Sequence, residues 1–172
     1  RGVPVAGSRV AVVGAGGSAR AVIAGLQQEG AHVTVHARDA VRAQALVNDF
    51  AAVREGGVGA SLGAWPVAPG SWDLLVNCTP VGMYPNVTPT PVPADALTGQ
   101  VVYDLIYNPM DTRLLREAVA AGCTAIGGLD MLVAQAQDQF QWWTGTRPEA
   151  AVMKAAALAR LVEFRAHENH DA

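Results

Sequence analysis

Short runs of β-branched and other apolar residues alternate along this chain with longer segments in which apolar residues recur every three or four positions. The short runs predict β-strands at residues 9–13, 32–37, 72–77, 101–106 and 122–126, with a further short strand around Val58. The longer segments predict helices at residues 18–29, 39–50, 111–121, 129–143 and 149–165. Two boundary residues support these limits, because Gly30 is a typical helix terminator and Asp39 is suited to cap the helix that follows it.

The order of these elements predicts an α/β fold. Strands that alternate with helices form a parallel sheet covered on both faces, and uninterrupted apolar runs suit strands buried on both sides. We therefore predict a Rossmann-type, doubly wound parallel sheet of about six strands in the order 3-2-1-4-5-6, followed by C-terminal helices. Ligands of such sheets bind at the carboxyl ends of the strands. The residues that fall there are Gly14, Arg38, Asn77, Tyr107 and Gly127.

Composition narrows the class of protein. The 172 residues suffice for about one domain, and a net charge of -3 provides no basic field for nucleic acid. No apolar run reaches the roughly 18 residues of a membrane-spanning helix. We therefore expect neither a nucleic-acid nor a membrane partner. Cys78 and Cys123 form neither a disulfide framework nor a metal-ligand spacing, so we expect a cytoplasmic protein without a metal site. Because the first residue is Arg1 and a strand begins at Arg9, we expect further chain upstream.

The segment between the first strand and the first helix has a phosphate-binding pattern. Residues 14–19, G-A-G-G-S-A, fit G-x-G-x-x-G/A in the context that a dinucleotide-binding loop requires. Gly14 permits a tight turn, Gly16 lets the backbone approach a pyrophosphate, and Ala19 allows close packing of the helix on the strand. The alternative is a plain glycine turn. The predicted pyrophosphate contacts are Gly14, Ala15, Gly16, Gly17 and Ser18.

The residues after the second strand bear on the choice of cofactor. An NAD-binding domain often has an acid there, whereas this chain has Ala37, Arg38 and Asp39, with Arg42 one helical turn further on. An arginine at this place can pair with the 2′-phosphate of NADP. Asp39 favours the opposite choice, because a carboxylate can accept from the free ribose hydroxyl of NAD. We therefore predict NADP as the cofactor, and NAD remains an alternative.

Three later segments, in order after the glycine loop, carry a resemblance to a known family. Residues 77–83 are N-C-T-P-V-G-M, residues 103–109 are Y-D-L-I-Y-N-P, and residues 127–136 are G-G-L-D-M-L-V-A-Q-A. Together with G-A-G-G-S-A-R they resemble the signatures of the shikimate dehydrogenase family, and they cover nearly the whole chain. The resemblance is to the C-terminal, NADP-binding domain of these enzymes.

The resemblance implies reduction of 3-dehydroshikimate to shikimate with NADPH, a step of aromatic amino acid biosynthesis. It implies that residues 1–172 form the cofactor domain and that an N-terminal substrate domain, absent from this chain, holds the catalytic lysine and aspartate. No catalytic residue is therefore assigned here. The resemblance places Arg38 and Arg42 on the adenosine side and assigns further contacts. These are Thr79, Leu105, Gly128 and Met131 for the cofactor, and Tyr107 and Gln135 for the substrate.

Other interpretations remain open from the residues alone. Thr79 and Asn77 are also typical of loop residues that bond their own backbone, and Tyr107 is also compatible with simple packing. The chain could be a stand-alone NAD(P)-binding module or part of a quinate/shikimate dehydrogenase that uses NAD. The related cofactor domain of glutamyl-tRNA reductase is a third alternative, but it gives no account of Tyr107 or Gln135.

Overall fold

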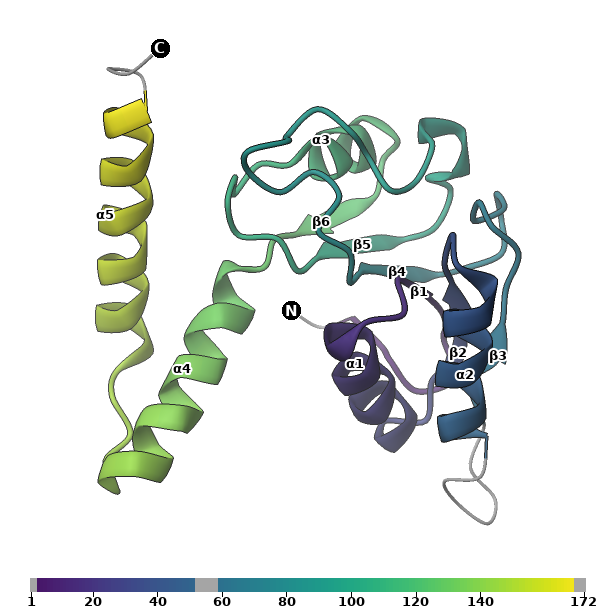
Figure 1. Cartoon of the computed structure of the whole chain (residues 1–172), viewed down its shortest axis with the longest axis horizontal. Helices are drawn as coiled ribbons and strands as arrows, with labels where there is room; N and C mark the ends of the chain where they lie inside the picture. The colour runs from purple at the N-terminus through teal and green to yellow at the C-terminus, as the bar shows by residue number, and fades with distance from the viewer. Residues whose placement is uncertain (1–2, 52–58, 169–172) are drawn as a thin grey trace. The chain divides into compact units, whose positions relative to one another are not determined.

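The computed structural model describes residues 3–51 and 59–168. The chain divides into two units, Arg1–Gly127 and Gly128–Ala172. The first unit contains all the described strands and three of the α-helices, and the second consists of two helices (Figure 1).

The first unit is built on a six-stranded parallel sheet in the order β3-β2-β1-β4-β5-β6. This confirms the predicted doubly wound fold and strand order. The strands are β1 (Arg9–Val13), β2 (His32–His36), β3 (Ser61–Leu62), β4 (Leu74–Asn77), β5 (Val101–Asp104) and β6 (Thr124–Ile126). The helices of this unit are α1 (Gly17–Gln28), α2 (Ala40–Phe50) and α3 (Arg113–Ala120), with a short 3-10 helix, η1 (Ala94–Ala96).

Both faces of the sheet are covered because successive side chains of a strand point to opposite faces. Val10 and Val12 of β1 pack into a core with α1 and α2, whereas Ala11 and Val13 pack into a second core with α3 and residues 92–97. Figure 1 shows α1 and α2 on one side of the sheet and α3 on the other. An uninterrupted apolar strand such as β1 is therefore buried on both sides, as its sequence predicts.

Two strands, β3 at the edge of the sheet and β5, differ in their limits from the sequence prediction. The third strand is β3 at Ser61–Leu62, and the strand predicted around Val58 lies outside the described residues. β3 is a two-residue exposed edge strand, so it has no apolar pattern to reveal it. β5 ends at Asp104 because the Asp104 carboxylate accepts from the N–H of Ile106, which removes that donor from the sheet.

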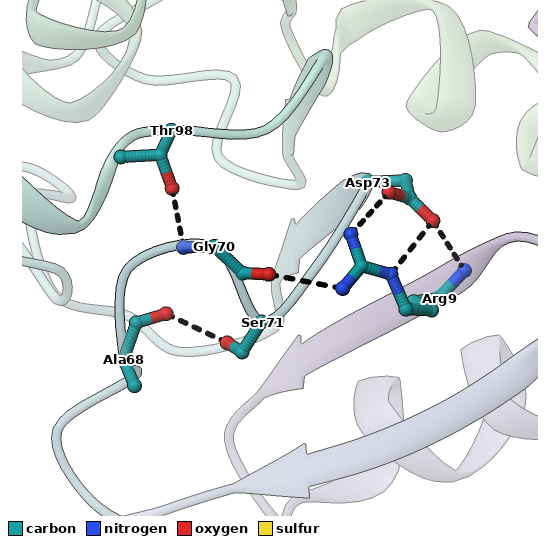
Figure 2. Close-up of polar contacts among 6 residues, drawn as sticks. All are labelled: Arg9, Ala68, Gly70, Ser71, Asp73 and Thr98. Carbon is teal, nitrogen blue, oxygen red and sulfur yellow. Dashed lines mark hydrogen bonds and ion pairs between the residues drawn. The ribbon is translucent and has the colours of Figure 1, made fainter.

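At the amino end of the sheet, an exposed ion pair connects β1 to the segment before β4 (Figure 2). The Asp73 carboxylate accepts from the Arg9 guanidinium at 2.6 Å and from the Arg9 N–H at 2.9 Å. The guanidinium also donates to the Gly70 carbonyl at 2.9 Å, and the Gly70 N–H donates to Thr98 Oγ1 at 2.7 Å. These bonds hold the loop that leads into β4 against its neighbours and lie at the end of the sheet opposite the glycine turn.

The second unit is a pair of helices, α4 (Leu129–Thr144) and α5 (Ala150–Glu168), that pack against each other. α4 ends at Gly145, whose φ of 73° suits a glycine that terminates a helix. Lys154 of α5 forms an ion pair with Asp130 of α4, with 2.5 Å between Nζ and Oδ1. Across the described residues, no helix combines the length and the apolar character needed to cross a membrane.

Candidate functional site

The loop from β1 to α1 turns sharply at Gly14. Its φ of 114° lies in the region that favours glycine, and its N–H donates to the His36 carbonyl at 2.8 Å. A Cβ at this position would lie 3.1 Å from Thr79 Cγ2 and 3.2 Å from the Cys78 carbonyl oxygen. Gly14 is thus required both by its backbone conformation and by the close approach of the residues that follow β4.

The glycines at the start of α1 have a different environment. A Cβ built at Gly16 or Gly17 meets no atom of the described chain within 4 Å. Gly16 caps α1 without a side-chain hydrogen bond, and the first N–H groups of a helix have no acceptor inside it. Ala19 is fully buried, as predicted for close helix packing. The start of α1 therefore combines unpaired donors, partial positive charge and free space, which suits a phosphate group.

The end of β2 brings Arg38, Asp39 and Arg42 next to this turn. Asp39 caps α2, because its carboxylate accepts from the Arg42 N–H at 3.0 Å. One carboxylate oxygen of Asp39 is therefore already bonded to the start of a helix, where the helix dipole stabilises negative charge. His36, which ends β2, is buried and bonds the Ala64 carbonyl through Nδ1 at 2.7 Å.

Arg38 and Arg42 differ from the other arginines whose side chains are described. Within residues 3–51 and 59–163, neither of their guanidinium groups forms an ion pair, and both side chains are exposed. The arginines that do pair with a carboxylate are Arg9, Arg20, Arg113, Arg116, Arg147 and Arg160. Two neighbouring guanidinium groups without a protein counter-ion favour binding of an anion.

A groove of about 590 Å³ connects the glycine turn with these arginines. This volume falls in the range of about 300–1,000 Å³ that is usual for small-molecule and cofactor sites. Predicted site residues in its lining are Gly14, Ala15, Gly16, Ala37, Arg38, Asp39, Arg42 and Thr79. Lining residues that were not predicted are Trp65, Cys78, Pro80, Val81, Pro89, Thr90 and Pro91. The length of the proline-rich loop at residues 80–93 was a sequence signal for most of these, whereas nothing in the sequence singled out Trp65.

Thr79 lies in the groove, but its hydroxyl is engaged within the protein. The hydroxyl donates to Asn77 Oδ1 at 2.7 Å and accepts from the Val81 N–H at 3.2 Å. This is the backbone-bonding role that the residue type allowed. Because the Thr79 N–H also donates to Asn77 Oδ1, at 2.9 Å, the methyl group is the part of the side chain left for a ligand. Burial, and then the Asp104 carboxylate, raise the pKa of the neighbouring Cys78 thiol to about 12, so this cysteine is unsuited to act as a nucleophile.

The remaining predicted residues lie outside the groove lining. Leu105 follows β5 and donates its N–H to the Asn77 carbonyl at 3.2 Å, and Tyr107 is exposed two residues later. Gly17 and Ser18 belong to the first turn of α1. The others belong to the second unit, at the start and in the first turns of α4. They are Gly128, Met131 and Gln135.

No cluster of three or more histidine, cysteine or acidic side chains that could hold a metal ion occurs among the described residues. Cys78 and Cys123 are both free thiols. The chemistry that the described site offers is therefore that of hydrogen-bond donors, two arginines and an apolar wall.

Comparison with known proteins identifies relatives of this arrangement. Residues 128–158 match the family model described as the Shikimate 5'-dehydrogenase C-terminal domain. The chain is 42% identical over 163 residues to the shikimate dehydrogenase (NADP(+)) of Methanosarcina mazei, covering 93% of this chain and 58% of that protein. This chain thus spans little more than half the length of the curated relative.

Solved structures give the same picture. A crystal structure of shikimate dehydrogenase in complex with NADP+ matches with a TM-score of 0.82 and 34% identity, covering 91% of this chain and 55% of that chain. Quinate dehydrogenase from Corynebacterium glutamicum in complex with NAD matches with a TM-score of 0.76 and 32% identity, covering 88% of this chain and 55% of that one. Enzymes similar to this chain therefore include one bound to each of the two dinucleotides.

Proposed function

We propose that this chain, which belongs to the shikimate dehydrogenase family, is the dinucleotide-binding domain of an NADP-dependent enzyme that interconverts 3-dehydroshikimate and shikimate. The observation that carries the proposal is the pair Arg38 and Arg42, which lack a carboxylate partner among the described residues and share one groove with the glycine turn. When bound, the nicotinamide of such a cofactor accepts or supplies a hydride. The residues of this chain bind and orient it.

The glycine turn is proposed to hold the pyrophosphate. Gly16 and Gly17 leave room beside the start of α1, and the N–H groups of residues 16–18 supply donors and partial positive charge. Ala15 lies in the same lining and completes the turn. Side chains larger than hydrogen at position 16 would then exclude the phosphate while leaving the protein contacts intact.

Selection of NADP over NAD is proposed to depend on Arg38 and Arg42. Both guanidinium groups are available to the 2′-phosphate, and a charge-assisted hydrogen bond contributes about 1.5–3 kcal/mol. Asp39 opposes this choice by its charge, but its bond to the Arg42 N–H commits it to capping α2. The second candidate, a quinate or shikimate dehydrogenase that uses NAD, is favoured by Asp39 and by the likeness to the NAD-bound quinate dehydrogenase.

The two cofactors test this directly. Isothermal titration calorimetry with NADP+, NAD+ and adenosine 2′,5′-bisphosphate should give tighter binding of NADP+ than of NAD+, and measurable binding of the bisphosphate. Equal affinities, or tighter binding of NAD+, would mean that Asp39 governs the ribose site and that the NAD-dependent alternative is correct. Absence of binding to all three ligands would contradict a dinucleotide-binding function altogether.

The chemical step is proposed to need a second domain. Hydride transfer at a secondary alcohol also moves a proton, and a group within reach must carry it. Lys154 is the only lysine of the chain, and it is paired with Asp130 between α4 and α5. We therefore propose that an N-terminal domain supplies the lysine and aspartate pair. The family resemblance assigns Leu105, Gly128 and Met131 to the nicotinamide end of the cofactor.

The substrate and the cellular location complete the proposal. Tyr107 and Gln135 are proposed to bind the substrate, because a hydroxyl and an amide can both donate to and accept from a polyol and a carboxylate. Met131 and Gln135 are four residues apart on α4, so they share one face of that helix. A cytoplasmic location is proposed because both cysteines are free thiols.

A further inference from the structure

A buried carboxylate lies behind the groove without lining it. Asp104 ends β5, is fully buried and pairs in register with Asn77 of β4. Its Oδ1 accepts from Asn77 Nδ2 at 2.9 Å and from the Ile106 N–H at 3.1 Å, and its Oδ2 accepts from the Thr112 hydroxyl at 2.6 Å. All three partners are donors, so the ionised acid satisfies them with its two oxygens.

These bonds continue from Asp104 toward the groove. Asn77 is also fully buried, and its Oδ1 accepts from both the N–H and the hydroxyl of Thr79, at 2.9 and 2.7 Å. The Thr79 hydroxyl then accepts from the Val81 N–H. We name this series of bonds, from Asp104 through Asn77 and Thr79 to Val81, the Asp104 hydrogen-bond chain.

The direction of each bond follows from the one before it. A carboxylate can only accept, so Asp104 turns the NH₂ group of Asn77 toward itself. The oxygen of the same amide must then face the two donors of Thr79. If the Asn77 amide were rotated by half a turn, its NH₂ group would face the Thr79 N–H, and buried donors would lose their acceptors at a cost.

Thr79 and Val81, the last members of the Asp104 hydrogen-bond chain, belong to one wall of the groove. Cys78, Thr79, Pro80 and Val81 all belong to its lining. The methyl group of Thr79 also lies next to the site where a Cβ of Gly14 would fall, so this wall sets the width of the groove beside the glycine turn.

We propose that Asp104 is a positioning residue for the dinucleotide groove, which through Asn77 holds the Thr79–Val81 wall in place beside Gly14. This inference rests on the proposed function, because it assumes that the groove binds the dinucleotide. Asp104 makes no contact with the groove itself. Its effect is transmitted by hydrogen bonds whose direction its charge determines. Burial raises the pKa of Asp104, and the bonds from Thr112, Ile106 and Asn77 oppose that rise.

Two variants test whether Asp104 determines the direction of these hydrogen bonds. In the wild type, three donors share the two carboxylate oxygens of Asp104. In Asp104→Asn, a single amide oxygen must accept from all three. We expect Kd for NADP+ to rise by about 10- to 100-fold, in line with the loss of a buried hydrogen bond to a charged group. The double variant Asn77→Asp/Asp104→Asn reverses the pair, so that the new amide donates to the new carboxylate and Thr79 keeps its acceptor. We expect it to restore most of the affinity.

Amide NMR spectra provide a signature that general destabilisation would not produce. The ¹H–¹⁵N resonances of Thr79 and Val81 should shift in Asp104→Asn. In the double variant the Thr79 N–H again has an acceptor, a carboxylate oxygen, and should shift back to lower field, whereas the Ile106 resonance should stay shifted because its acceptor is lost. The control is Leu114→Ala, which removes a buried apolar side chain of α3 but no side-chain hydrogen bond. It should lower Tm and leave Kd unchanged.

The outcomes separate this inference from the proposed function. Failure of the wild-type chain to bind NADP+ would overturn the proposed function. Binding by the wild type with an unchanged Kd in Asp104→Asn, or no recovery in the double variant, would overturn the positioning role of Asp104. If Asp104→Asn does not fold, Thr79→Val and Thr79→Ser decide the question. Valine removes the hydroxyl and keeps both γ-carbons of the side chain, whereas serine keeps the hydroxyl, so Thr79→Val should weaken NADP+ binding more than Thr79→Ser. Equal affinities of the two variants would refute the Asp104 hydrogen-bond chain.

Discussion

Replacing Gly14 by alanine and Gly16 by valine separates the two reasons for which this loop needs glycine. At Gly14 the protein itself demands glycine, because φ is 114° and a Cβ would approach the Cys78 carbonyl oxygen to 3.2 Å. At Gly16 a Cβ meets no described atom within 4 Å, and the backbone is extended at φ -101° and ψ -169°. We therefore expect Gly14→Ala to damage the fold and Gly16→Val to damage only binding.

The size of each effect follows from these environments. A non-glycine residue in a disfavoured backbone region costs about 1–3 kcal/mol, and the tight contact with a backbone carbonyl adds to this. We expect Gly14→Ala to lower the free energy of unfolding by about 2–4 kcal/mol, or Tm by roughly 4–16 °C. Gly16→Val should change that free energy by less than about 0.5 kcal/mol, as is usual for exposed positions. Its Kd for NADP+ should rise beyond the measurable range, because the valine occupies the space proposed for the pyrophosphate.

Thermal unfolding followed by circular dichroism measures the first effect, and calorimetric titration with NADP+ measures the second. Gly25→Ala is the matched control, because its Cβ also meets no described atom within 4 Å and Gly25 lies in α1 outside the groove lining, so Kd for NADP+ should not change. A Gly16→Val protein that unfolds early would show that Gly16 is structural. A Gly16→Val protein that binds NADP+ normally would remove the pyrophosphate from this turn, and a neutral Gly14→Ala would refute the argument from φ and contact distance.

Three further predictions concern other parts of the chain. Arg38→Ala should weaken NADP+ binding by about 1–3 kcal/mol in calorimetry and leave NAD+ binding nearly unchanged, and an equal loss for both cofactors would contradict the 2′-phosphate assignment. Hydrogen bonds from the side chain and the N–H of Arg9 hold the pKa of Asp73 below its ordinary value. The pair therefore stabilises the fold above about pH 4, and this contribution is lost as the pH falls through the lowered pKa of Asp73. The Tm difference between wild type and Asp73→Asn should accordingly shrink in acid, and a difference that grows in acid would be inconsistent with this sign. The 172-residue chain alone should not oxidise shikimate when saturated with NADP+, whereas addition of the proposed N-terminal domain should produce NADPH absorbance. Turnover by the chain alone would require a proton acceptor within it.

Much of the fold was predictable because parallel strands and their helices carry local patterns. β1 is apolar on every residue after Arg9, and α2 begins at a capping aspartate, so both elements were predicted close to their observed limits. The strand order followed from the alternation of elements and the handedness of their crossovers. A short strand was predicted around Val58, outside the described residues, and the position of β3 at Ser61–Leu62 was not, because a two-residue edge strand with exposed side chains has no apolar period.

The candidate site was partly predictable for the same reason. The glycine turn and the residues after β2 are continuous segments at strand ends, and their local pattern was enough to bring Gly14, Gly16 and Arg38 into one list. Trp65 reaches the same groove from a distant part of the chain, and no local signal relates it to the groove.

Only the tertiary structure decided how the polar groups pair. The sequence contains carboxylates and arginines throughout, but the folded chain leaves Arg38 and Arg42 without an acidic partner in its described part and gives one to Arg9 and Arg20. It likewise places Asn77 opposite Asp104, which are 27 residues apart in sequence. Apolar periodicity is a property of consecutive residues, and it therefore appears in the sequence. A hydrogen bond between strands depends on the register of two segments that become neighbours only after the chain has folded.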